Sequence, residues 1–140
     1  MNRIAELWAA GTAPGWDGLY RADGSARAVV VDDARLSRFD LGPPLDLDAL
    51  LAEDPEWLAE IDITDEVELS DGSGHLCAGQ GAHGSQGFFA RLDPERNLVW
   101  LVSLGDSNPF VRVTVDGTTA KFTNNLGNSI TVDLTTPDLA

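Results

Sequence analysis

From residue 61 to the end of the chain, apolar residues recur at every second position or in short unbroken runs. This period of two is that of a β-strand, because successive side chains of a strand point to opposite faces of its sheet. Short segments rich in Asp, Asn, Gly and Pro separate the runs, which favours turns between neighbouring strands. The pattern predicts a twisted antiparallel meander, with strands over the following ranges: 61–70, 87–92, 98–104, 111–115, 120–123 and 130–134.

Two features interrupt this pattern. Asp65 falls on the apolar side of the alternation, so we expect the strand to bend there or to carry an inward charge that protects a sheet edge. The segment 72–87 is rich in glycine and includes Gly79–Gly84, a literal G-x-G-x-x-G. A dinucleotide-binding loop needs a strand before these glycines and a helix after them, and the sequence predicts neither. We therefore expect a flexible loop.

The first third of the chain carries helical and hairpin signals instead. Ile4, Leu7 and Trp8 have the spacing of one helix face, and Asn2 is a suitable N-cap. Further along, two strand-like runs, 18–21 and 26–31, flank an Asp-Gly turn and predict a hairpin.

Two more short helices are expected after the hairpin. The first covers residues 47–51 and is capped by Asp46. The second runs from Asp54 to residue 61, with Pro55 at its first position and Trp57 pointing inward. The predicted fold class is α+β, with short N-terminal helices and a hairpin before the antiparallel meander. The length of 140 residues predicts a single domain over residues 1–140.

The charge balance restricts the partners that the chain can bind. Its 23 acidic and 9 basic residues give a formal net charge of −14, which excludes a basic groove for nucleic acid and a cationic membrane-surface helix. No apolar run is long enough to span a membrane, and Glu6 interrupts the apolar residues that a signal peptide would need. The single cysteine, Cys77, cannot form an internal disulfide. We therefore expect a cytoplasmic protein.

The acidic residues concentrate in one part of the chain. No lysine or arginine occurs between Arg38 and Arg91, while twelve carboxylates lie between Asp40 and Asp71. Three interpretations remain open: a soluble surface, a surface that attracts a cationic partner, or carboxylates that gather a hard cation such as calcium. For the second, the predicted partner-binding residues are the acids of this segment and a tryptophan in a Pro-Gly loop, which we expect to be exposed: Asp54, Glu56, Glu60, Asp62, Glu66, Glu68, Asp71 and Trp16.

His75, Cys77 and His83 form the one group with possible metal-binding or nucleophilic chemistry. A zinc ion or a Cys–His pair uses these residue types, but the acidic surroundings oppose a thiolate and no C-x-x-C pattern is present. The ordinary interpretation is a small buried cysteine and two histidines in a loop. No catalytic motif is found, so we predict neither an enzyme nor a bound cofactor or metal.

The segment that runs from Asp71 through the glycines to the strand Gly87–Asp93, followed by Leu98-Val99-Trp100, resembles small bacterial immunity proteins of polymorphic toxin systems. This resemblance implies an intracellular inhibitor that binds one cognate toxin. Together with the acidic charge, it predicts a protein that binds and neutralises a cationic protein partner. The alternatives are a soluble structural or scaffold domain, and a small-ligand or metal-binding domain that uses the Gly-rich loop with His75 and His83.

Overall fold

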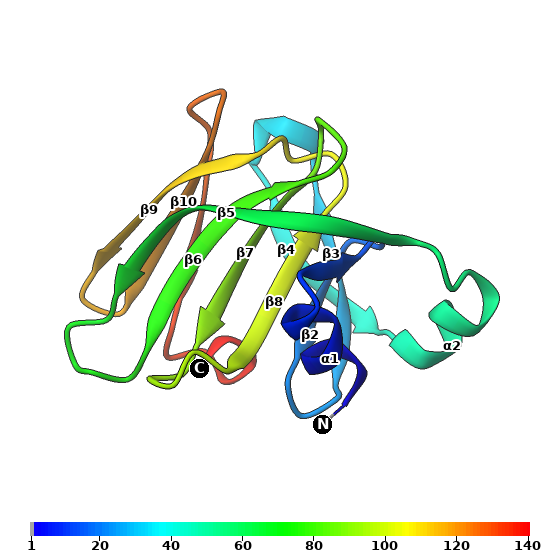
Figure 1. Cartoon of the computed structure of the whole chain (residues 1–140). Coiled ribbons are helices and arrows are strands. Elements are labelled where there is room, and N and C mark those ends of the chain that lie inside the picture. The colour runs from blue at the N-terminus through cyan, green and yellow to red at the C-terminus, as the bar shows by residue number, and fades with distance from the viewer. Residues whose placement is uncertain (1) are drawn as a thin grey trace.

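The computed structural model describes residues 2–140, which form two antiparallel sheets and two short helices (Figure 1). The helices are α1 (Arg3–Ala9) and α2 (Leu47–Glu53), and two 3-10 turns cover Asp33–Arg35 and Pro137–Leu139. The strands are β1 (Thr12–Pro14), β2 (Gly18–Arg21), β3 (Ala26–Val31), β4 (Phe39–Pro44), β5 (Leu58–Glu68), β6 (His75–Gly81), β7 (Gly87–Leu92), β8 (Leu98–Leu104), β9 (Phe110–Asp116), β10 (Thr119–Asn124) and β11 (Ser129–Asp133). The predicted α+β class is confirmed.

The larger sheet has eight strands in the order β1-β5-β6-β7-β8-β2-β3-β4, and the smaller sheet has three in the order β11-β10-β9. Strands β5 to β8 follow one another as a meander, and the hairpin β2–β3 joins this meander through β8. The hairpin and the strands after residue 87 agree with the sequence pattern in their positions, but β9, β10 and β11 form a separate sheet and do not continue the predicted single meander. The sequence did not predict the two edge strands, β1 and β4, and both contain proline.

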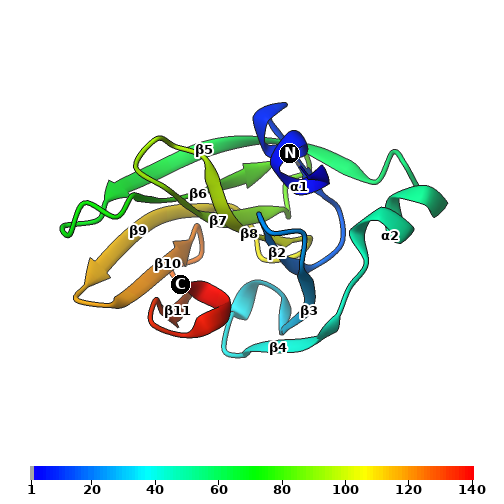
Figure 2. The same cartoon turned by 90° about the horizontal axis from the view of Figure 1, so that it is seen from below.

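Both faces of the larger sheet are covered, and Figure 2 shows α1 and the smaller sheet on opposite sides of β6 to β8. Towards the smaller sheet, Phe89 stacks on Phe122 with ring centroids 4.1 Å apart. Towards the helices, Phe88 meets Trp8 of α1 edge to face, at 5.8 Å. A strand covered on both faces needs apolar side chains on both, which explains the nearly unbroken apolar run of β8. We call the face of the larger sheet that packs on the smaller sheet the small-sheet face, and the opposite face, which packs on the helices, the helix face.

The two helices begin where the sequence predicted. The side chain of Asn2 accepts a hydrogen bond from the Ala5 amide, and that of Asp46 accepts one from the Ala49 amide. These contacts satisfy backbone donors that a helix start leaves free. No helix within residues 2–140 is long and apolar enough to cross a membrane.

The predicted helix from Asp54 to residue 61 is wrong. Residues 54–57 form a turn, in which the Trp57 amide donates to the Asp54 carbonyl, and β5 begins at Leu58. The carbonyl of Trp57 then accepts a hydrogen bond of 2.8 Å from the Gly15 amide, which extends the pairing of β1 with β5. The sheet offers this segment partners for its backbone, whereas a helix would place Glu56 and Glu60 one turn apart, where like charges repel.

The predicted flexible loop over residues 72–87 is also wrong, because β6 runs through it between β5 and β7. Its glycines allow close packing rather than flexibility. A Cβ on Gly79 would collide with the carbonyl oxygen of Asp62 and lie 2.7 Å from the Phe88 ring. Only a glycine fits at this position of β6, between β5 and β7.

Candidate partner-binding surface

A β-bulge divides the predicted acidic face of β5 into two parts. Asp62 pairs with Gln80 of β6 and Glu66 pairs with Cys77, and the register shifts between Ile63 and Asp65. Residues paired across two strands share a face, and positions three apart along β6 lie on opposite faces. Asp62 therefore faces the small-sheet side, as does Glu60, two residues earlier. Glu66 and Glu68 face the helix side.

The bulge also accounts for Asp65, the residue out of phase in the sequence. Its side chain accepts a hydrogen bond of 2.8 Å from the Val113 amide, so it joins the edge of β9 to β5. The Thr64 hydroxyl donates to the Phe110 carbonyl at the start of the same strand. These contacts attach the smaller sheet to the larger one, which gives Asp65 a structural partner.

Glu66 differs from the other predicted binding residues because a cation neutralises it. The Arg96 guanidinium donates two hydrogen bonds to its carboxylate, at 2.6 and 2.8 Å, and His75 lies 4.0 Å away. These hydrogen bonds, with the charge of Arg96, hold the pKa of Glu66 below its ordinary value. Glu66 is therefore less able to attract a partner than a free carboxylate.

The remaining predicted acids lie at two ends of β5. Asp71 is in the turn after the strand, where hydrogen bonds from Ser73 lower its pKa, and Glu68 is the last residue of the strand. Asp54 and Glu56 precede the strand, and Glu60 and Asp62 lie in its first half. At about 3.3 Å per residue, the nearest members of the two groups, Asp62 and Glu68, are roughly 20 Å apart along β5. The structure does not bring all the predicted residues into one patch.

The first of these groups is exposed and without counter-charge. Its members are Asp54, Glu56, Glu60 and Asp62, and we call it the acidic segment. Within residues 2–140, no arginine, lysine or histidine comes within ion-pair distance of these four carboxylates. The exposed cations without an ion pair, Arg112 and Lys121, lie on the outer face of the smaller sheet. The exposed carboxylates of Asp116 and Asp133 share that face with the two cations.

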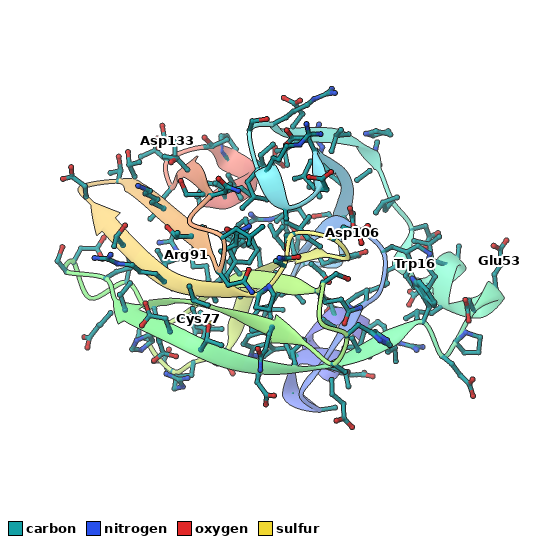
Figure 3. All side chains as sticks on the ribbon, turned by 90° about the horizontal axis from the view of Figure 1, so that it is seen from above. Trp16, Glu53, Cys77, Arg91, Asp106 and Asp133 are labelled. Carbon is teal, nitrogen blue, oxygen red and sulfur yellow. The ribbon has the colours of Figure 1, made fainter. Side chains whose placement is uncertain are left out.

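Two of the four tryptophans, Trp16 and Trp57, lie in environments opposite to those predicted. Trp16, predicted to be exposed, is half-buried against the core on the helix face, whereas Trp57, predicted to point inward, is 52% exposed. Figure 3 shows Trp16 with Glu53 at the end of the molecule that carries α2. The Trp57 ring lies against Gly15, so closely that a Cβ on Gly15 would be 2.5 Å from two of its atoms.

Beside Trp57 is a surface depression of about 400 Å³ that we call the Trp57 depression. The carboxylates of Asp17 and Asp106 line it, together with the loop that joins β6 to β7. Asp17 accepts a hydrogen bond of 2.8 Å from the Gly105 amide. Burial, and to a lesser degree the charge of Asp106, raise the pKa of Asp17 despite this bond.

The fold separates His75, Cys77 and His83, the residues considered for metal binding or nucleophilic chemistry. His75 begins β6 and His83 follows its end, which places them roughly 20 Å apart at about 3.3 Å per residue. Cys77 is fully buried, and burial, assisted by Glu66, raises its pKa to about 12 (Figure 3). Within residues 2–140, no group of three or more His, Cys, Asp or Glu side chains is arranged to hold a metal ion. The fold therefore does not bring the three residues together.

Sequence reasoning missed Asp17 and Asp106 as surface residues of interest, and it assigned Trp57 to the core. One signal was available for Trp57, because an Asp-Pro turn precedes it and an alternating strand follows. No signal in the sequence joins Asp17 to Asp106, since 88 residues separate the Asp17 carboxylate from its Gly105 partner. Comparison of the chain with known proteins finds no matching family model, curated protein or solved structure.

Proposed function

We propose that this chain binds and neutralises a cationic protein partner, in the manner of the immunity proteins that its sequence resembles. The observation that carries the proposal is the acidic segment, in which four exposed carboxylates have no counter-charge within residues 2–140. Such a group raises the energy of the free molecule by repulsion, and a cationic surface that covers it removes this cost. The proposed binding surface consists of the acidic segment and Trp57.

The overall charge supports the same surface. With a net charge of −14, and with no arginine, lysine or histidine of residues 2–140 in an ion pair with its four carboxylates, the acidic segment attracts a cation. Steering of this kind raises association rate constants and weakens with salt, because about 0.1 M salt screens charges beyond about 10 Å. Glu68 and Asp71, at the other end of β5, are outside the proposed surface.

The test compares two variants with the same change of net charge. The partner to be used is the product of the gene adjacent to that of this chain, because inhibitors and their toxins are encoded together. We expect the double variant E56K/E60K to associate about ten-fold more slowly than the wild type at low salt. The control variant E68K/D71K has the same charge but changes the other end of β5, and we expect less than about a three-fold effect.

Stopped-flow or surface-plasmon measurements at several salt concentrations give these rate constants. Equal slowing in both variants would show that only the total charge matters and would contradict the proposed surface. Absence of any complex between the two wild-type proteins would contradict the proposed function itself.

A further inference from the structure

Trp57 is the most distinctive feature of the proposed surface, because a large apolar ring is exposed there and yet held in place. Its backbone carbonyl is fixed by the Gly15 amide at 2.8 Å, and its ring lies against the Gly15 backbone. Exposed tryptophans that are already ordered lose little freedom on binding, and they are common among the residues that dominate binding energy at interfaces. One face of this indole is therefore ready to receive a ligand.

The chemistry around the ring identifies the kind of ligand. The residues that line the Trp57 depression include Trp57, the two acidic residues Asp17 and Asp106, and His83. Within residues 2–140 no cation forms an ion pair with either carboxylate. Asp17 is half-buried and is repelled by Asp106. A flat cation would both stack on the indole and neutralise the carboxylates.

We propose, on the basis of the function proposed above, that the Trp57 depression receives an arginine side chain of the cationic partner. A guanidinium group is planar and stacks on an aromatic ring, and its five N–H donors reach two carboxylates at once. A lysine ammonium is a compact, strongly hydrated charge that gains less from the ring. The depression thus prefers arginine to lysine.

The probe for this proposal is a short blocked peptide with one arginine between serine and glycine residues. Two otherwise identical peptides carry lysine or the uncharged isostere citrulline. Titration of the isotope-labelled protein at pH 7.5 follows the indole N–H of Trp57 and the backbone N–H of Gly105, which donates to Asp17. We expect saturable shifts of both signals with the arginine peptide, about five-fold weaker binding of the lysine peptide, and no saturation with citrulline.

Three variants locate the binding. We expect W57A and D106N each to weaken the binding of the arginine peptide by about five-fold, because each removes a group that the guanidinium contacts. Both side chains are exposed, so their removal leaves the core intact. The control is D116N, which removes one exposed carboxylate at the end of β9 and should bind like the wild type. Unchanged thermal unfolding of each variant confirms that it is folded.

Equal binding of the arginine and lysine peptides, or equal weakening by D116N and D106N, would overturn the proposal. Failure of this inference is distinguishable from failure of the proposed function. If the partner protein binds W57A as tightly as the wild type, the acidic segment carries the interaction without the depression. If no partner protein binds but the arginine shifts saturate, the depression is a guanidinium site and the proposed function is wrong.

Discussion

Glu66 illustrates how one neighbour changes the role of an acidic residue. In the sequence it is one of twelve carboxylates in a segment without cations, but in the structure two hydrogen bonds from Arg96, 30 positions later, neutralise it. Its side chain is 29% exposed, which leaves the pair partly screened by solvent. The pair joins β5 to the turn between β7 and β8, so it contributes to stability rather than to attraction of a partner.

The lowered pKa of Glu66 predicts a pH dependence of stability. A carboxyl group whose pKa is lower in the folded state contributes stability above its unfolded pKa, and this contribution is lost as pH falls through the folded pKa. We expect E66Q to be less stable than the wild type at pH 7 by about 0.5–1 kcal/mol. The difference should shrink at pH values below the ordinary pKa of 4.5.

Urea unfolding of both proteins at pH 7 and at pH 3 measures this double difference, in which the effects of the other carboxylates cancel. A difference that stays constant between the two pH values would contradict the role of the ionised pair.

At the scale of single elements, Gly79 controls whether β5 and β6 can pair. We expect G79A to lower the free energy of unfolding by about 1–3 kcal/mol or more, because the added methyl group meets a backbone oxygen that cannot move without breaking the strand. The matched control is G84A, in the loop after β6, where a Cβ meets nothing within 4 Å. Denaturant unfolding of the two variants should show a large loss only for G79A.

The elements that the sequence predicted correctly are those with a local cause. The side chains of Asn2 and Asp46 accept hydrogen bonds from amides three positions later, and the hairpin turn after Arg21 is four residues long. The start of β5 at Leu58 was missed because its backbone partner, Pro14, lies 44 positions earlier. Strand β6 was missed because its glycines signal a loop locally, whereas the approach of Asp62 and Phe88 that requires them depends on the completed sheet.

The candidate site was predictable in composition but not in arrangement. The alternation of β5 placed Asp62 and Glu66 on one face, and a single extra residue at the bulge reverses the second half of the strand. Asp65 signalled this irregularity, but the sequence alone left open whether the strand bends or carries an inward charge. The Trp57 depression depends on loops brought together from four parts of the chain, for which no local pattern exists.

At the scale of the whole molecule, the excess of carboxylates predicts a stability that rises with salt. Self-repulsion at a net charge of −14 destabilises the folded state, and salt screens it. We expect the melting temperature at pH 7 to rise by about 4 °C between 0.01 and 0.5 M sodium chloride, equivalent to about 1 kcal/mol. Differential scanning calorimetry measures this rise. At pH 4, close to the sequence pI of about 4.1, the same salt change should have little effect.

The edge strands of the larger sheet, β1 and β4, affect how readily copies of this chain associate at high concentration. Pro14 lies at the end of one, and Pro43 and Pro44 at the end of the other. Since proline has no backbone N–H, neither border presents a complete row of donors on which a second copy could add its own strand. The prolines thus oppose fibrous self-assembly through these two edges of the sheet, even where salt screens the repulsion between the acidic molecules.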